Sequence, residues 1–266
     1  MAITCYLSGR LGNIVFSQAQ MIAYAKKHDL SYYVPTEAIA YRHFRNDITN
    51  PLLLPSTGAK PVNPIIYDEP GNKKTENPQY FEIPKMDNIM LRGYFQSFLY
   101  FDWCRDHILQ TFNVPYQMEA GMTAISVRRG DCLRSPEAFP IAPKEYYVNA
   151  VDYMNQRGFN KFRVYSDDIE WCKKNFTVEN FPDSTFEFSE GQTEVQNWAS
   201  IACCENQITA RSTFSLTAAW FNRNPNKIVC VPTYRHRWWR SVNKDLLTGT
   251  DFIQIDFQNI TDEWSK

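Results

Sequence analysis

The stretch Val127-Arg128-Arg129-Gly130-Asp131 decides the fold, because it places two adjacent arginines directly after an expected strand at residues 123–127. In α/β proteins, ligands bind beyond the carboxyl ends of parallel strands. The guanidinium group can donate two parallel hydrogen bonds to phosphate oxygens. We therefore expect Arg128 to hold the diphosphate of a nucleotide-sugar. The alternatives are that both arginines are surface charges or that they form an ion pair with Asp131.

Polar residues follow two more expected strands. Ser166-Asp167-Asp168 comes after residues 162–165, and Ser212-Thr213-Phe214-Ser215 comes after residues 207–209. Strands and helices alternate in this half, which predicts a largely parallel sheet whose strand ends share one edge. Hydroxyl and amide groups at a helix start suit phosphate, and carboxylates suit a ribose or the amino edge of a base. The same residues have other readings, since Asp167, Asp168 or Ser212 could cap a helix, and paired aspartates could hold magnesium or manganese.

The first half opens with a strand-like run at residues 3–7, a turn containing Gly12 and Asn13, and an expected helix at about 15–28. Strand, glycine turn and helix form the general plan of a nucleotide-binding unit. Gly12 allows close approach of the backbone to a ligand, and Asn13 could either cap the helix or face the site. Eight of the 15 prolines lie in residues 35–84, which predicts an irregular region there. A strand at 89–91 and a helix at 100–112 are expected to follow.

Composition limits the classes of partner. The chain has 266 residues and a net charge of −1, which argues against nucleic acid as the main partner. No apolar run approaches the roughly 20 residues that span a bilayer, and the start does not read as a signal peptide. Seven cysteines, an odd number with no Cys-x-x-Cys spacing, suggest reduced thiols in the cytoplasm. The basic and aromatic stretch at 234–240 could rest on the inner face of a membrane, stack on an acceptor sugar or pack between domains.

Several short motifs resemble those of the α-1,2-fucosyltransferases of glycosyltransferase family 11 and, more distantly, of the α-1,6- and protein O-fucosyltransferases. They occur in the family's order from position 9 to position 220: Gly9-Arg10-Leu11-Gly12-Asn13, Gly93-Tyr94-Phe95-Gln96-Ser97 with Tyr100-Phe101, Arg128-Arg129-Gly130-Asp131, Tyr146-Tyr147, Ser166-Asp167-Asp168 with Trp171, and Ser212-Thr213-Phe214-Ser215 with Ala219-Trp220.

The resemblance implies a GT-B-like α/β fold of two Rossmann-like halves. The acceptor-side domain would cover residues 1–115 and the GDP-sugar-binding domain residues 116–266, with the donor site in the C-terminal half. It implies a GDP-fucose donor, a galactose-containing glycan acceptor and no metal or other cofactor in the chemical step. Arg128 would contact the β-phosphate, Asn13 would reach the donor from the first domain, and the motif containing Ser215 would help to hold the nucleotide.

Five residues, at four places in the chain, depart from the family pattern. Ser126 stands where the family commonly has histidine, Ile14 where it has glutamine, Asn197 where it has an acidic residue (Glu194 is close by), and Leu216-Thr217 where it often has two tryptophans. These changes keep two other hypotheses open. One is a glycosyltransferase that uses a different nucleotide-sugar, and the other is a non-catalytic module that binds a sugar nucleotide or a glycan.

The chemistry of fucosyl transfer fits these residues. Negative charge grows on the leaving phosphate in the transition state, where a fixed guanidinium such as Arg128 stabilises it. Transfer to the acceptor hydroxyl, expected to be the 2-hydroxyl of a galactoside with inversion at the anomeric carbon, also benefits from a general base. Glu137 is our candidate base, although it could be a solvated loop carboxylate. Asp131 is the rival candidate, or else it orients the arginines.

Overall fold

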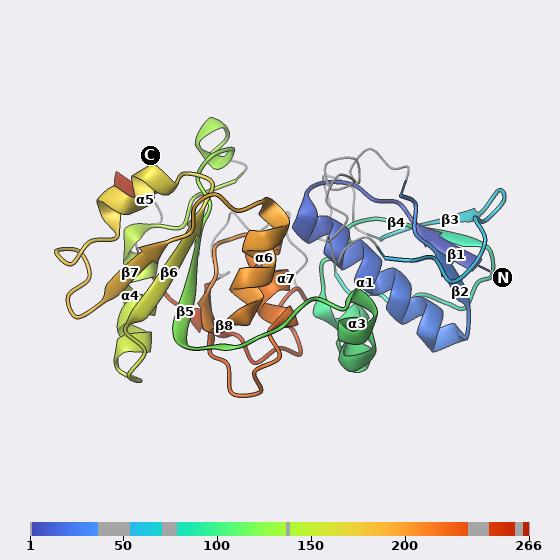
Figure 1. Ribbon diagram of the computed structural model, residues 1–266. Coiled ribbons are helices and arrows are strands. Elements are labelled where there is room, and N and C mark those ends of the chain that lie inside the picture. Colours follow the sequence, from blue (N-terminus) through green and yellow to red (C-terminus); the bar gives the residue numbers. More distant parts are fainter. Residues whose placement is uncertain are drawn as a thin grey trace. The chain divides into compact units, whose positions relative to one another are not determined.

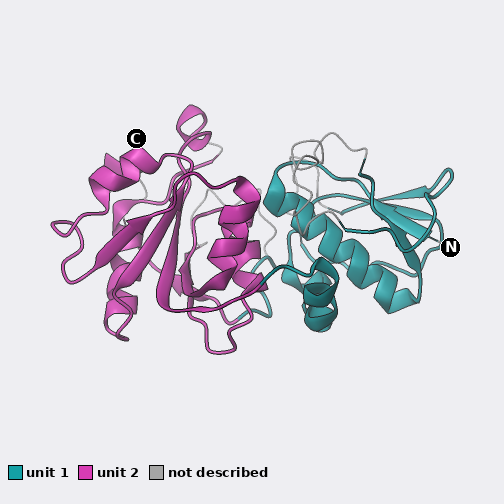
Figure 2. Ribbon diagram, viewed as in Figure 1, with its two compact units in different colours: residues 1–115, 240–250 teal, residues 116–239, 251–266 magenta. Residues whose placement is uncertain are grey.

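A computed structural model describes residues 2–36, 54–70, 79–136, 139–233, 245–258 and 263–265. The chain divides into two compact units, which Figure 2 shows in different colours. Unit 1 comprises Met1–Pro115 with Arg240–Thr250, and unit 2 comprises Tyr116–Trp239 with Asp251–Lys266. Every strand pairing in the described residues is parallel. The predicted fold class, GT-B-like with two Rossmann-like α/β halves, is confirmed.

Unit 1 contains a four-stranded sheet in the order β2-β1-β4-β3. Its strands are β1 (Ala2–Cys5), β2 (Ser31–Tyr33), β3 (Ile65–Asp68) and β4 (Ile89–Arg92). Helix α1 (Leu11–His28) connects β1 to β2 and lies along the sheet (Figure 1). After β4 come the short turns η1 (Phe98–Tyr100) and η2 (Asp102–Cys104) and then helix α3 (Arg105–Phe112).

Three features of unit 1 differ from the sequence-based expectation. Helix α1 begins at Leu11 rather than near residue 15, because Gly9 adopts a left-handed φ of 79° and turns the chain at once into the helix. The expected helix at 100–112 is instead two 3-10 turns followed by α3. Within the proline-rich region, β3 forms because four residues free of proline pair in register with β4.

Unit 2 contains a six-stranded sheet in the order β10-β9-β8-β5-β6-β7. The strands are β5 (Glu119–Val127), β6 (Lys161–Ser166), β7 (Thr185–Phe188), β8 (Cys204–Ile208), β9 (Val229–Pro232) and β10 (Ile253–Ile255). Helices α4 (Lys144–Asn155), α5 (Ile169–Asn175), α6 (Glu194–Cys203) and α7 (Thr213–Phe221) connect them, and η3 (Cys132–Arg134) and η5 (Glu263–Ser265) are short turns. This is the doubly wound strand order. The chain adds β6 and β7 on one side of β5 and then adds β8, β9 and β10 on the other side, so the order of the strands reverses between β5 and β8.

The core of unit 2 explains two elements that the sequence pattern does not predict, β10 and η5. The apolar side chains of α4 pack on Ile125 and Val127 of β5, and Ile255 of β10 joins the same cluster. Trp264 of η5 is 2% exposed and its ring contacts those of Tyr147 and Trp171. Burial of these aromatic and apolar side chains holds the last residues of the chain against the sheet.

The described residues 245–250 group with unit 1, although they lie in the sequence range expected for the domain of residues 116–266. Asp245 connects this segment to the rest of unit 1 by two hydrogen bonds. Its Oδ2 accepts the backbone N–H of Tyr80 at 2.8 Å, and its carbonyl oxygen accepts the hydroxyl of Ser97 at 2.9 Å. Leu246 beside it is buried.

Two chain-wide expectations can be compared with the structure. All seven cysteines are free thiols, as predicted. Among the described residues, no helix combines the length and the apolar character that a membrane span requires.

Candidate functional site

The loops after β5 and β8 meet at the reversal point of the unit 2 sheet. Strands β5 and β8 are neighbours, with Ile125 paired to Ile208. In doubly wound sheets, the connections from two such strands diverge and leave a crevice where ligands bind. Arg128 directly follows the end of β5, and Arg211 lies in the loop after β8. The carboxyl edge between these loops is therefore the candidate site of unit 2.

Arg128 is held along one edge of its guanidinium. Its Nη2 lies 2.8 Å from Asp131 Oδ2 and its Nε 3.2 Å from Oδ1, so the predicted ion pair with Asp131 is present. The Arg128 side chain is 27% exposed and lies 5.7 Å from the centre of the Phe139 ring. In the described part of the chain, no acceptor lies within hydrogen-bonding distance of its Nη1. Asp131 thus orients Arg128 and leaves one donor edge for a ligand.

Burial and charge act in opposite directions on Arg128. Burial works to lower the pKa of its guanidinium, whereas the hydrogen bond to Asp131 and the negative charges of Asp131 and Asp167 raise it. The pKa is raised overall, so the side chain keeps its positive charge at any pH at which the protein is folded.

Arg129 is buried whereas Arg128 is partly exposed, so donor binding by Arg129 stays a prediction that its packing does not favour. Side chains alternate between the two faces of a strand, so Arg129 continues the face of Ile125 and Val127, which pack in the core. Its side chain is 4% exposed. The guanidinium stacks 3.8 Å from the centre of the Trp171 ring, its Nε lies 3.3 Å from Asp168 Oδ2, and its Nη1 donates to the carbonyl oxygen of Trp264.

The aspartates after β6 hold the loop after β5 in place. Asp167 Oδ1 accepts the backbone N–H of Arg129 at 2.8 Å. A Cβ on Gly130 would lie 2.8 Å from Asp167 Oδ2, so this approach requires glycine. Asp168 occupies the N-cap position of α5 but makes no capping hydrogen bond with its side chain, and its own N–H donates to Ser166 Oγ at 2.9 Å. The structure therefore gives Ser166, Asp167 and Asp168 roles in shaping the loop, and the capping alternative is wrong for both aspartates.

At the start of α7, the capping alternative for Ser212 is confirmed. Its Oγ accepts the N–H of Phe214 at 3.3 Å. Ser215 is fully buried, and its hydroxyl lies 3.2 Å from the carbonyl oxygen of Ala210 and 3.1 Å from that of Ser212. Ser215 therefore ties the loop to the helix, while Thr213 and Phe214 are half-buried in the first turn. The loop presents the N-terminus of α7, where backbone N–H groups and the helix dipole favour an anion.

In unit 1, the corresponding strand ends gather Gly12, Asn13 and Gln96. Asn13 lies in the first turn of α1, where Arg10 is the N-cap residue. It does not cap the helix; its Oδ1 accepts Gln96 Nε2 at 2.8 Å. Gly12 is buried inside the helix. A Cβ on Gly9 would lie 2.3 Å from Asn13 Nδ2, so Gly9 is required for Asn13 to occupy this place.

Two residues at these strand ends are absent from the sequence-based candidates. Arg211 lies in the loop between β8 and α7, and its position between an apolar strand and a polar helix start was the available signal. Glu69 follows β3 and is 4% exposed, and its Oε2 accepts the N–H groups of Tyr94 and Phe95 at 2.8 and 2.9 Å. Burial raises the pKa of Glu69. No sequence signal marked it, because its role depends on the close approach of Gly93.

Some predicted features lie outside the described residues. Glu137, the candidate base, is one of them, and so is the basic and aromatic stretch at 234–240. Among the residues that are described, no group of three or more histidine, cysteine, aspartate or glutamate side chains could hold a metal ion.

Three of the residues that depart from the family pattern form hydrogen bonds within unit 2. Ser126 is buried, and its carbonyl oxygen accepts the hydroxyl of Tyr147 at 3.2 Å. Asn197 Oδ1 lies 2.7 Å from Ser189 Oγ. Thr217 is buried, and its Oγ1 accepts the indole N–H of Trp198 at 3.0 Å. A threonine at position 217 therefore satisfies a buried tryptophan between α6 and α7.

Comparison with known proteins gives relatives that act on sugars. The chain is 29% identical over 186 residues to the O-antigen biosynthesis glycosyltransferase WbnK of Escherichia coli, a match covering 62% of this chain and 60% of the relative. It is 38% identical over 117 residues to an Escherichia coli alpha-1,2-colitosyltransferase (41% of this chain, 39% of the relative). It is 24% identical over 239 residues to the galactoside 2-alpha-L-fucosyltransferase SEC1 of Bos taurus (82% and 63%). The matched part thus spans less than two thirds of each relative.

A crystal structure of POFUT1 in complex with GDP superimposes with a TM-score of 0.43 at 13% identity, covering 83% of this chain and 93% of that one. The family model described as Glycosyl transferase family 11 matches residues 2–245, nearly the whole chain. This confirms the resemblance that the ordered motifs indicate, and the chain belongs to glycosyltransferase family 11.

Proposed function

We propose that this family member is an inverting transferase that moves L-fucose from GDP-fucose to the 2-hydroxyl of a galactoside. The observation that carries the proposal is the geometry of Arg128. Asp131 holds its Nε–Nη2 edge, while Nη1 meets no acceptor in the described residues, at the carboxyl edge where the sheet reverses. A guanidinium fixed in this way is suited to a diphosphate.

The reaction requires a positive charge beside the leaving phosphate. The bond between C1 of fucose and the β-phosphate oxygen breaks, and its electron pair stays on the phosphate. The acceptor oxygen bonds to C1 from the opposite face, and its proton passes to a base. Charge on the leaving phosphate grows as the bond stretches, so Arg128 stabilises the transition state more than the ground state.

The other groups at the site have supporting roles in this proposal. The N-terminus of α7, with the adjacent Arg211, would bind the second phosphate group. Asp131 and Asp167 would hold Arg128 and the 129–130 loop in position, as their hydrogen bonds indicate. From unit 1, Asn13 would contribute the polar contact that the family resemblance implies.

Glu137 remains our candidate for the general base. Its rival Asp131 places both carboxylate oxygens on Arg128, at 2.8 and 3.2 Å. An oxygen in such a bidentate pair is a poor proton acceptor, because protonation would break the ion pair. We therefore assign Asp131 to orientation and Glu137 to proton removal.

Names of the relatives support the reaction class and also a second candidate. Galactoside fucosyltransferases match 80–82% of the chain at 24% identity. The alpha-1,2-colitosyltransferase shares 38% identity over 117 residues. This higher local identity favours, as the second candidate, transfer of a different sugar from its own nucleotide-sugar to the same kind of hydroxyl.

The test is release of GDP from GDP-fucose with and without β-galactosides, with GDP-colitose, GDP-mannose and UDP-galactose as competing donors. Galactoside-dependent release from GDP-fucose supports the proposal. Turnover only with another donor replaces it with the second candidate, and donor binding without turnover points to a non-catalytic module. NMR analysis of the product would show the linkage position and the anomeric configuration.

We also propose that no metal ion takes part in the chemical step, since Arg128 supplies the charge that a divalent cation would otherwise provide. Activity should survive EDTA unchanged. Loss in EDTA with recovery on adding Mn²⁺ would contradict this proposal. Because all seven cysteines are free thiols, we propose that the chain works in the reducing cytoplasm.

A further inference from the structure

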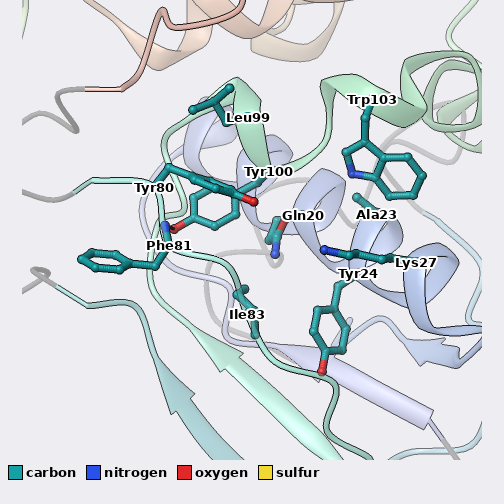
Figure 3. A pocket seen from close by; sticks show the side chains of 10 residues that line it. All are labelled: Gln20, Ala23, Tyr24, Lys27, Tyr80, Phe81, Ile83, Leu99, Tyr100 and Trp103. Atoms are coloured by element: carbon teal, nitrogen blue, oxygen red, sulfur yellow. Dashed lines mark hydrogen bonds between the residues drawn. The ribbon is translucent and has the colours of Figure 1, made fainter.

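Unit 1 contains a pocket of about 300 Å³ between the second half of α1, residues 80–83 and residues 99–103. Five aromatic residues contribute to its walls: Tyr24, Tyr80, Phe81, Tyr100 and Trp103. Figure 3 shows Gln20 near the centre, with Tyr80 and Tyr100 on one side and Trp103 and Lys27 on the other. The volume lies at the lower end of the range for ligand sites in proteins.

The walls of this pocket are fixed by hydrogen bonds. The hydroxyl of Tyr100 accepts the N–H of Phe81 at 3.3 Å, and its ring lies 4.9 Å from that of Tyr80. The hydroxyl of Tyr24 donates to the carbonyl oxygen of Pro84 at 2.8 Å and accepts the N–H of Met86 at 2.8 Å. The segment that closes the pocket is thereby tied to α1, so the aromatic walls are pre-formed.

One polar group in the wall lacks a partner. Gln20 is 3% exposed, and its Oε1 forms no hydrogen bond with any part of the chain that the structure describes. This oxygen is itself closed to solvent, but the Gln20 side chain also lines the pocket, where its amide can form a hydrogen bond with a hydroxyl group. A hydrocarbon chain offers no hydrogen-bonding group, so the occupant that fits carries hydroxyl groups.

The lysine that lines the pocket is already paired with a carboxylate, which gives an anion little advantage as a ligand. The ammonium of Lys27 is paired with Glu82 at 2.7 Å. Trp103, by contrast, lines the pocket and is 54% exposed, so part of its ring is open to a ligand. A pyranose ring has the complementary chemistry, since its C–H face stacks on an aromatic ring while its hydroxyls donate hydrogen bonds.

We propose that this pocket binds a sugar residue of the acceptor glycan at a distance from the reacting galactose. Gln20 lies seven residues along α1 from Asn13, which is about 10 Å at the rise of an α-helix. This assignment to the acceptor rests on the proposed function, in which Asn13 lies near the donor. The pocket would then select longer glycans and act on acceptor binding rather than on the chemical step.

Two variants and two acceptors test the proposal. Lacto-N-tetraose serves as the long acceptor and methyl β-galactoside as the short one. Trp103→Ala and Gln20→Met should each raise the KM for lacto-N-tetraose about ten-fold, equivalent to about 1.4 kcal/mol of binding free energy, and leave kcat and the KM for methyl β-galactoside unchanged. Trp103→Phe should retain most of the binding, and Val62→Ala, which removes an exposed apolar side chain elsewhere in unit 1, should have no effect.

Binding measured without a donor separates this proposal from the proposed function. Saturation-transfer NMR should show contact of lacto-N-tetraose with wild-type protein and weaker contact with Trp103→Ala, whether or not fucose is transferred. Absence of any binding to the wild type would overturn the pocket assignment. So would equal KM values for the long acceptor in wild type and both variants, or an equal rise in KM for the two acceptors.

Discussion

Replacing Arg129 with alanine should destabilise unit 2 by about 3–5 kcal/mol, the range found when one partner of a buried ion pair is removed. The structure supports this magnitude. Stacking on Trp171 at 3.8 Å contributes about 1–2 kcal/mol when desolvated. The charged hydrogen bond to the carbonyl oxygen of Trp264 contributes about 1.5–3 kcal/mol. The pair with Asp168 adds less, because the Asp168 side chain is 32% exposed and regains water.

Urea denaturation of the Arg129→Ala protein followed by circular dichroism gives the loss of stability. A chain of two units need not unfold in one transition. Hydrogen exchange of the β5 and β6 amides therefore assigns the loss to unit 2. Arg134→Ala is the matched control, since Arg134 is exposed in η3 and should change stability by less than about 0.5 kcal/mol. An Arg129→Ala protein that keeps wild-type stability but loses GDP binding would refute the packing role and restore the donor-binding one.

Two other predictions concern residues that only the structure revealed. Arg211→Ala should weaken GDP binding by calorimetry about ten-fold, the loss expected for one charge-assisted hydrogen bond; unchanged affinity beside a folded control would remove Arg211 from the site. Burial raises the pKa of the Glu69 carboxyl above its ordinary value of 4.5. The folded protein therefore loses stability as pH rises through the raised pKa, because the buried carboxyl must then become charged. The side-chain oxygen of Glu69→Gln can still accept the N–H groups of Tyr94 and Phe95, but it carries no charge. The Tm of this variant relative to that of the wild type should therefore increase as pH rises from about 4 to about 8. A difference in Tm that stays constant over this range would contradict the account.

The arginine pair shows how far the sequence alone leads. A strand followed by two arginines predicts a ligand site at that strand end, and the structure places both arginines directly after β5. Which of Arg128 and Arg129 is buried depends on which face of β5 packs against α4, and the sequence does not determine that face. Once Ile125 and Val127 are known to face the core, the alternation of side chains puts Arg129 beside them.

Long patterned elements were easier to predict than short ones. Helix α4 (Lys144–Asn155) has five buried side chains at helical spacing, a pattern that can be read directly from the sequence. Strands β3 and β10 have four and three residues and carry too little pattern of their own. They form because a neighbouring strand and buried side chains stabilise them, and a linear reading of the chain does not contain those contacts.

The central claim is that Arg128 stabilises the charge that develops on the departing diphosphate. The most direct test is kcat for transfer from GDP-fucose to a galactoside by Arg128→Ala, with Arg134→Ala as the control and the urea midpoint measured for both. The account predicts that Arg128→Ala lowers kcat by about 10²-fold or more. Its stability should change by no more than about 1 kcal/mol, because the pair with Asp131 is partly exposed. A folded Arg128→Ala protein with near-normal kcat would contradict it.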